Sequence, residues 1–257
     1  MGNMHFLFIS PHLDDVVFSC GAYIGKLCAL GYPVSVLTIF SGSPAGNLSL
    51  LASMLHLEWG LPKDATEFRR EEDRQALAVL GGKALHAGFL DSIYRRDAES
   101  GKPIYRRLKE ILGQETVQET QLVKEIAQYL AGVLQEGTYH HTFVPLGLGG
   151  HVDHLITHAA IRLVMERRTD TQFHFYEDLP YAISDAPEGE RMIGKRQYFC
   201  TQSEGSSQKY NAMAKYVSQI KSVRYPGGID IDAIVRYGMD FENKPGVFAE
   251  RVWYPMG

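Results

Sequence analysis

The amino-acid sequence predicts an α/β fold, a Rossmann-like three-layer sandwich built on a mostly parallel sheet. The main observation is that short apolar runs rich in β-branched and aromatic residues alternate along the chain with amphipathic stretches of helical spacing. A second observation is the length of 257 residues, which suits a single α/β domain of about 250 residues. We therefore expect residues 1–257 to form one domain.

The first 40 residues have the pattern of a strand–helix–strand unit. Residues 5–10 (HFLFIS) form an apolar run that ends at Pro11, as expected for a buried strand. Residues 16–30 carry apolar side chains at mixed three- and four-residue spacings, and Gly31 follows as a helix terminator. Residues 34–40 (VSVLTIF) predict a second strand. So short a series indicates a parallel pair of strands joined by a right-handed crossover.

The same alternation continues along the rest of the chain. Further helices are expected at 65–80, 117–134, 153–165 and 208–220, and further strands at 84–89, 140–145 and 171–176. Residues 91–119 are charged and contain Gly101, Pro103 and Gly113, so we expect a variable loop or lid region there.

Composition and charge exclude several classes of protein. The chain has 26 Lys and Arg against 30 Asp and Glu, a net charge of −4, which argues against a nucleic-acid-binding surface. No apolar run approaches the roughly 18–20 residues of a membrane span, and the N-terminus lacks the pattern of a signal peptide. Cys20, Cys28 and Cys200 are few and widely spaced, so neither disulfides nor a cysteine-based zinc site is indicated. We expect a cytoplasmic protein without membrane partners, and a homo-oligomer remains open.

Two clusters of histidine and aspartate carry most of the functional signal. His12, Asp14 and Asp15 directly follow the first predicted strand. A second cluster, made of His151, Asp153 and His154, follows the strand at 140–145 and a glycine-rich turn. Because ligands of parallel sheets bind at the carboxyl ends of the strands, both clusters lie where a site is expected. Two or three imidazoles and a carboxylate are the composition of a catalytic zinc site with an open position.

Structural interpretations of the same residues stay open. Asp14, Asp15 and Asp153 could simply cap the helices that follow them. His154 and His158 have the spacing of a zincin pair, but Leu155 stands where a zincin needs its glutamate. We expect His158, and His140 and His141 in the strand, to be core or supporting residues. No partner motif accompanies His56, His86 or His174, so no role is expected for them.

The motif Pro-His-x-Asp-Asp at 11–15, paired with His-x-Asp-His at 151–154, resembles the LmbE-like (PIG-L) superfamily of zinc-dependent N-deacetylases. The resemblance extends over most of the chain. Further similar segments are Arg69 to Gly81, Asp91 after the third strand, Tyr176 to Tyr181, Lys209 to Gln219 and Glu250 to Trp253. Leu13 and Val152 stand where many relatives have proline, and both are spacers between the motif residues.

The resemblance implies a role for each motif residue. His12, Asp15 and His154 would hold Zn²⁺, or another divalent metal such as Fe²⁺. Asp14 would be the general base that takes a proton from the attacking water, and His151 the acid that assists departure of the amine. Asp153 would orient or tune its neighbouring histidine.

The implied reaction is hydrolysis of the acetamide of an N-acetyl amino sugar of the GlcNAc type, in a glycoconjugate or a related small metabolite. Arg69, Asp91 and Tyr181 are the expected substrate contacts, although Arg69 could instead pair with Glu72 or Asp73. Two alternatives remain open: a metal-dependent hydrolase of another amide or ester, and a non-catalytic metal-binding α/β protein.

Overall fold

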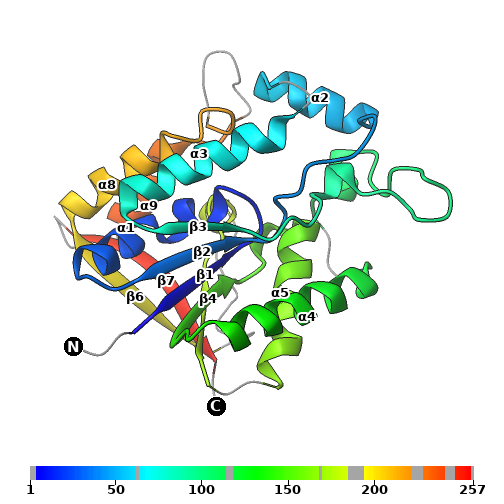
Figure 1. Cartoon of the computed structure of the whole chain (residues 1–257). Helices are drawn as coiled ribbons and strands as arrows, with labels where there is room; N and C mark the ends of the chain where they lie inside the picture. Colours follow the sequence, from blue (N-terminus) through cyan, green and yellow to red (C-terminus); the bar gives the residue numbers. More distant parts are fainter. Residues whose placement is uncertain are drawn as a thin grey trace.

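The computed structural model describes residues 4–61, 64–113, 118–167, 170–184, 194–220, 228–240 and 247–255. Its centre is a seven-stranded sheet in the order β3-β2-β1-β4-β5-β7-β6 (Figure 1). The five strands from β3 to β5 run parallel, and β7 is antiparallel to both of its neighbours. The strands are β1 (Phe6–Ser10), β2 (Val34–Thr38), β3 (Lys83–His86), β4 (His141–Pro145), β5 (Gln172–Tyr176), β6 (Gly194–Gln202) and β7 (Val247–Pro255).

Helices cover both faces of the sheet and complete a three-layer sandwich (Figure 1). One face carries α1 (Asp15–Ala29), α3 (Ala65–Leu80), α8 (Ser203–Met213) and α9 (Ile231–Met239). On the other face lie α4 (Thr120–Glu136) and α5 (Val152–Met165). The shorter α2 (Leu50–Trp59) and α6 (Tyr181–Ser184) lie in loops that leave the carboxyl ends of strands. The expected fold class is therefore confirmed.

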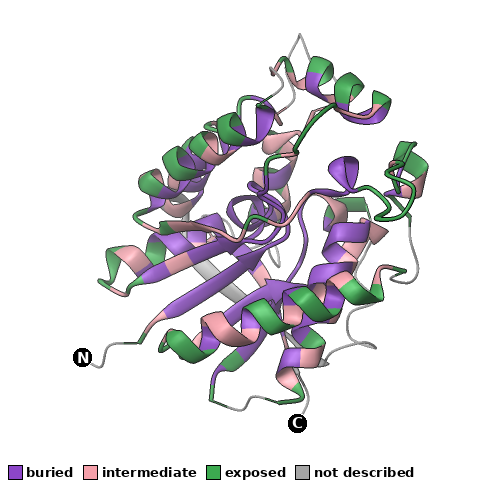
Figure 2. Ribbon diagram, turned by 45° about the vertical axis from the view of Figure 1, so that its right-hand side comes forward, coloured by how far each residue is buried: buried purple, intermediate pink, exposed green. Residues whose placement is uncertain are grey.

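The two hydrophobic cores follow from the alternation of side chains along β1. Phe6 and Phe8 point into the core under α1, α3 and α8, whereas Leu7 and Ile9 point into the core under α4 and α5. All four side chains are buried, as expected for a parallel strand covered on both faces. Figure 2 shows the central strands of the sheet coloured as buried along most of their length.

Some elements differ from the prediction. The helix α2 was not anticipated, because it is apolar on more than one side and so lacks amphipathic periodicity. Ser49 begins it by accepting a hydrogen bond from the Ala52 amide at 3.1 Å. The helix expected at 208–220 instead begins at Ser203 and ends at Met213. The strands β6 and β7 were not predicted either, and β3 ends three residues earlier than expected.

The segment 91–119 is less loop-like than its charge suggests. It contains the short 3₁₀ helices η1 (Ser92–Tyr94) and η2 (Leu108–Glu110). Ile93, Tyr105 and Ile111 are buried in the core beneath α4 and α5, while residues 96–102 are exposed. This segment is therefore anchored at several points along its described length. Among all the described helices, none has the length and apolar character needed to cross a membrane.

Candidate active site

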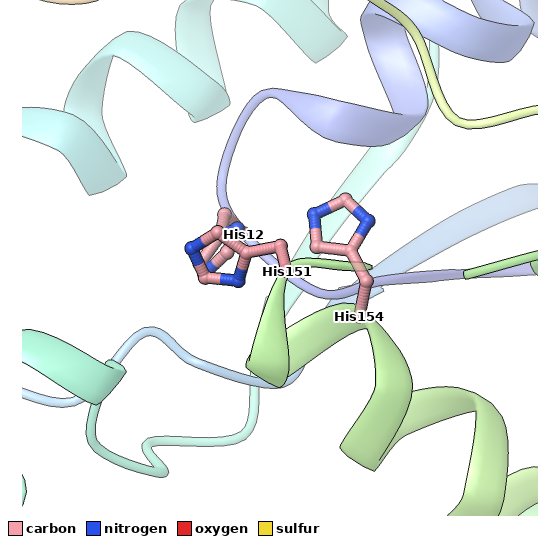
Figure 3. A group of neighbouring side chains, drawn as sticks. All are labelled: His12, His151 and His154. Carbon is pink, nitrogen blue, oxygen red and sulfur yellow. The ribbon is translucent and has the colours of Figure 1, made fainter. Parts of the chain in front are cut away.

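The two predicted clusters meet because β1 and β4 are neighbours in the sheet. His12 follows β1, whereas His151 and His154 lie at the start of α5, after β4. The ring centroid of His12 lies 4.8 Å from that of His151 and 5.3 Å from that of His154. Figure 3 shows the three imidazoles turned toward one another, and one nitrogen from each lies within 4.8 Å of the others.

One carboxylate oxygen lies between two of these imidazoles. Asp15 Oδ2 is 3.2 Å from His12 Nδ1 and 3.2 Å from His154 Nε2. His154 Nε2 is buried and makes no hydrogen bond to any described residue. Donor atoms of a tetrahedral zinc ion, each about 2.0–2.1 Å from the metal, lie about 3.3 Å apart. The spacing of these three atoms and the unsatisfied nitrogen therefore fit a divalent metal ion.

The remaining nitrogen of each of these histidines contacts a buried carboxylate. His154 Nδ1 lies 2.6 Å from Asp178 Oδ1, and His12 Nε2 lies 3.0 Å from Asp153 Oδ2. Asp178 is itself held by the Gly147 amide, which donates to its other oxygen at 2.8 Å. Carboxylates in this position fix the ring orientation and tautomer of histidines that bind metals. A His/Asp site suited to a divalent metal is thus present.

Asp14 and Asp15 do not act as helix caps. Asp14 precedes α1, but its side chain accepts no capping hydrogen bond. Its carboxylate is buried 3.6 Å from Arg69 Nη2, and burial raises its pKa to about 6 although Arg69 opposes this shift. The surroundings of Asp15 act oppositely: His154 and His12 hold its pKa well below the ordinary value despite burial.

His151 is the residue that caps α5. Its Nδ1 accepts a hydrogen bond from the Asp153 amide at 3.1 Å, and Nε2 has no hydrogen bond to a residue that the structure describes. Burial lowers the pKa of the His151 imidazole, and the nearby His12 lowers it further. The ring therefore favours the neutral form that carries its proton on Nε2.

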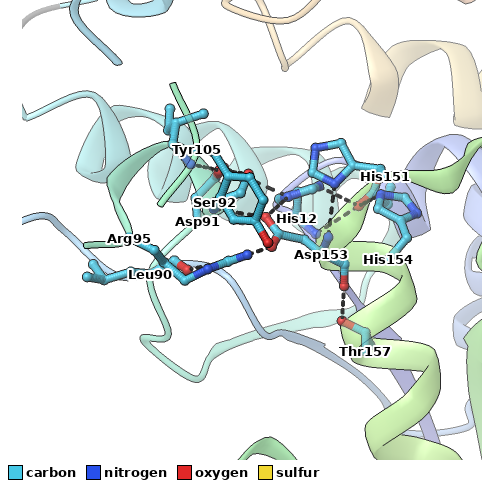
Figure 4. A network of polar contacts seen from close by, with 12 residues as sticks. His12, Leu90, Asp91, Ser92, Arg95, Tyr105, His151, Asp153, His154 and Thr157 are labelled. Atoms are coloured by element: carbon cyan, nitrogen blue, oxygen red, sulfur yellow. Dashed lines mark hydrogen bonds and ion pairs between the residues drawn. The ribbon is translucent and has the colours of Figure 1, made fainter. Parts of the chain in front are cut away.

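Asp153 contacts a different histidine from the one expected. The prediction paired it with a neighbour in the sequence, but its Oδ2 lies beside His12, which comes from the other cluster. The same oxygen accepts from the Ser92 amide at 3.0 Å, and Oδ1 accepts from Arg95 at 2.5 Å (Figure 4). The loops after β1 and β3 converge on the start of α5, so this pairing is a tertiary one.

Arg69 faces the site and not the acidic residues of its own helix. Its guanidinium lies 3.6 Å from Asp14 and 3.9 Å from Asp91, and it stacks over the Trp59 ring at 5.0 Å. Glu72 instead accepts hydrogen bonds from Ser218, and Asp73 pairs with His86. Asp91 Oδ1 accepts from the Ile93 amide, and its Oδ2 lies 3.8 Å from His12 Nε2.

A pocket of about 190 Å³ opens onto these groups. Tyr181 lines one side of it, where its ring meets the His154 ring edge-on at 5.4 Å between centroids. Gly149 permits this approach, because a Cβ there would lie 2.3 Å from the Tyr181 ring and its φ is +77°. The remaining wall of the pocket is mostly apolar and comes from several separate segments. It consists of Leu55 and Trp59 of α2, Asp91, Ile93, Leu108, Ile111 and Leu112 of the 91–119 segment, and Pro180, Gln219 and Ile229.

Sequence reasoning missed three residues of the site. Asp178 lies in a segment that was noted for its resemblance, but no role was given to it. Trp59 and Arg95 carried no signal, because each reaches the site only through the path of its loop. The histidines without a motif have structural partners: His56 bonds Tyr94, His86 bonds Asp73, His141 bonds His174, and His158 bonds the Pro145 carbonyl.

Comparison with known proteins extends these observations. The family model for GlcNAc-PI de-N-acetylase (PIG-L) matches residues 7–165, which contain both clusters. The chain is 31% identical over 191 residues to 2'-N-acetylparomamine deacetylase of Niallia circulans, covering 68% of this chain and 67% of that protein. It is 30% identical to the Streptomyces fradiae protein of the same name, covering 73% of this chain and 61% of the relative.

Solved structures agree over nearly the whole chain. The zinc-inhibited form of teicoplanin deacetylase superposes with a TM-score of 0.84 at 28% identity, covering 97% of each chain. The chain has a buried His/Asp site at the carboxyl ends of a parallel sheet, and these relatives and this similar structure are deacetylases. The protein is therefore an N-deacetylase. The chain belongs to the GlcNAc-PI de-N-acetylase (PIG-L) family, as the paired motifs predicted.

Proposed function

We propose that this enzyme uses a divalent metal to hydrolyse the acetamide of an N-acetyl amino sugar, releasing acetate and a free amine. The observation that carries the proposal is the group of three convergent donor atoms beside a fourth side chain, Asp14, which is not needed as a ligand. The relatives named for deacetylation of an acetylated aminoglycoside and of teicoplanin support this substrate class.

His12 Nδ1, Asp15 Oδ2 and His154 Nε2 would hold the metal. Two imidazole nitrogens and one carboxylate oxygen suit Zn²⁺, and they suit Fe²⁺ as a second choice. A bound metal would acidify a water molecule and polarise the acetyl carbonyl. The carboxylates near the site outnumber the guanidinium groups of Arg69 and Arg95, so a dication would offset most of the excess negative charge. These buried carboxylates belong to Asp14, Asp15, Asp91, Asp153 and Asp178.

Asp14 is placed to accept a proton from the attacking water. Its buried carboxylate does not lie between the histidines, and its raised pKa matches a general base that works near neutral pH. The proton that it accepts is then available for the nitrogen of the breaking C–N bond. His151 presents Nε2, from which it would donate to the acetyl oxygen as negative charge develops and assist departure of the amine.

Arg69, Asp91 and Tyr181 line the pocket and are the proposed contacts for sugar hydroxyls. Residues of the 91–119 segment and Pro180, beside Tyr181, also line the pocket, and Leu55 and Trp59 of α2 add a further wall. A small N-acetylated sugar or glycoconjugate is the proposed substrate, and a cytoplasmic location remains a prediction.

A substrate panel tests the proposal. The purified protein, supplied in turn with Zn²⁺, Fe²⁺ or Co²⁺ at one equivalent, would be assayed for free-amine release. The panel contains N-acetylglucosamine, its alkyl and aryl glycosides, acetylated aminoglycosides, acetylated amino acids and simple esters. We expect metal-dependent amine release from the N-acetyl sugars above all others. Release only from esters or amino-acid amides would overturn the substrate class, and metal binding without any release would favour a non-catalytic protein.

A further inference from the structure

We propose that Arg95 is a positioning residue of the metal site, which fixes the Asp153 carboxylate and thereby holds the His12 imidazole in its ligand orientation. This inference rests on the proposed metal site, and it assigns to the 91–119 segment a function other than that of a lid. Figure 4 shows the contacts that link Arg95 to His12 through Asp153.

Arg95 itself is firmly held. Both carboxylate oxygens of Glu119 accept from it, Oε1 from Nε at 3.0 Å and Oε2 from Nη2 at 2.8 Å. Its Nη1 also donates to the Leu90 carbonyl at 3.1 Å. The central carbon of the guanidinium also lies over two aromatic rings, 5.3 Å from the centroid of Phe40 and 5.4 Å from that of Tyr105. A guanidinium held by these hydrogen bonds and ring contacts has little freedom to turn.

Asp153 is the shared acceptor of this arrangement. Its side chain is fully buried, and Arg95 Nη1 donates to Oδ1 at 2.5 Å. The Ser92 amide donates to Oδ2, the oxygen that also lies 3.0 Å from His12 Nε2. Two donors from the same short segment therefore set the position of the carboxylate, which in turn sets the plane of the His12 ring. A third bond, from the Val152 amide to the Ile111 carbonyl at 2.9 Å, ties this segment to the start of α5.

Without Arg95, the ring of His12 would lose this constraint although none of the three donor atoms is removed. Changes to carboxylates that orient metal-binding histidines typically weaken metal affinity 10- to 100-fold. Misplacement by a fraction of an ångström also lowers the rate of a positioned reaction. Loss of Arg95 should therefore weaken the metal and slow turnover while leaving the sugar-binding side of the pocket in place.

The test measures zinc dissociation constants by competition with a chromophoric chelator, which needs no substrate. Arg95→Met should bind zinc about 10- to 100-fold more weakly than the unchanged protein. Its kcat at saturating metal should fall while KM stays within about 3-fold. Arg96→Met is the matched control, because among the described residues the exposed Arg96 donates hydrogen bonds only to the backbone carbonyls of Gly101 and Asn47. It should bind zinc and turn over normally.

A double variant separates positioning from general damage. If Arg95 acts through Asp153, Arg95→Met combined with Asp153→Asn should bind zinc no more weakly than Asp153→Asn alone. Glu119→Gln keeps the shape of the side chain but weakens its hold on Arg95, so it should lower the affinity for zinc several-fold. This variant carries the test if Arg95→Met does not fold. The inference would be overturned if Arg95→Met and Glu119→Gln both bound zinc as tightly as Arg96→Met does. It would also be overturned if the losses of zinc affinity from Arg95→Met and Asp153→Asn multiplied in the double variant. Failure of the unchanged protein to bind any divalent metal would instead overturn the proposed function as well.

Discussion

Asp14 and Asp15 are adjacent in the sequence, but their carboxylates face different partners. Asp15 Oδ2 lies between two imidazoles, whereas Asp14 faces Arg69. We therefore expect Asp15→Asn to lose bound metal. Asp14→Asn should retain it and lose about 10²- to 10⁴-fold in kcat, the usual contribution of a general base. Metal content by elemental analysis, measured beside kcat for both variants, checks this. The reverse pattern, with metal lost from Asp14→Asn and kept by Asp15→Asn, would exchange the two roles.

His174 gives the fold a dependence on pH that is separate from catalysis. Burial lowers its pKa to about 3, and the neighbouring His141 contributes to the shift. Between pH 3 and about 6.5 the unfolded chain binds a proton at this residue that the folded protein excludes, so stability falls as the pH falls. Each pH unit in this window costs up to about 1.4 kcal/mol.

His174→Phe should remove part of this acid sensitivity, because a phenyl ring can pack against Phe143 and Tyr254 without titrating. Urea unfolding at pH 7 and pH 4.5 measures the difference in unfolding free energy. The exposed His140 provides a comparison, and His140→Gln is unfolded under the same two conditions. An equal pH dependence in His174→Phe and the unchanged protein would show that other groups cause it.

At the scale of elements, one buried ion pair joins α1, α8 and β7. Lys209 Nζ lies 2.7 Å from Glu250 Oε1, and both side chains are almost fully buried. The two oxygens of Glu250 also accept from the amides of Ala22 and Tyr23, in the middle of α1. Neither Lys209 nor Glu250 lines the pocket of the site, so this pair gives a structural role to two residues of the segments that resemble the family.

Lys209→Met should lower the free energy of unfolding by about 3–5 kcal/mol, because it leaves the Glu250 carboxylate buried without its cation. Lys215→Met, at an exposed position of the turn after α8, should change stability by less than about 0.5 kcal/mol. Denaturant unfolding of both variants gives the comparison. Adding Glu250→Gln to Lys209→Met should restore part of the lost free energy of unfolding. A loss of under about 1 kcal/mol in Lys209→Met would show that the ion pair contributes little to stability.

At the scale of the whole molecule, the proposed metal site couples ligand binding to folding. Its donors come from the loop after β1, the start of α1 and the first turn of α5, so they converge only when the sheet is formed. Zinc at 1,000 times its dissociation constant should therefore stabilise the protein by about 4 kcal/mol. For a chain of this size that corresponds to a rise in Tm of roughly 10 °C.

Thermal unfolding at increasing zinc, beginning from chelator-treated protein, measures this rise. Asp15→Asn should show little of it, because the variant lacks the oxygen between the two imidazoles. Identical Tm values with chelator and with zinc would mean that the cluster does not bind the ion in the folded state.

Local pattern was enough to locate the two clusters and the fold class. Strand-like runs and helical spacing are properties of neighbouring residues, and a cluster that follows a parallel strand must lie at the carboxyl edge of the sheet. The meeting of His12 with His154 could be expected on that basis. The pocket positions of Arg69, Asp91 and Tyr181 were expected only from the resemblance to the family.

The pairing of Asp153 with His12, and the support given by Asp178 and Arg95, depended on the tertiary structure. So did α2, which places Trp59 beside Arg69, and the antiparallel strands β6 and β7. Residue types and spacings specify short-range periodicity, whereas contacts across 24 to 141 residues depend on where each loop turns and which elements pack together. The sequence by itself thus determined the fold class, the edge of the sheet that carries the site and the residues of the two clusters. Only the packed chain decided which side chains hold those residues in place.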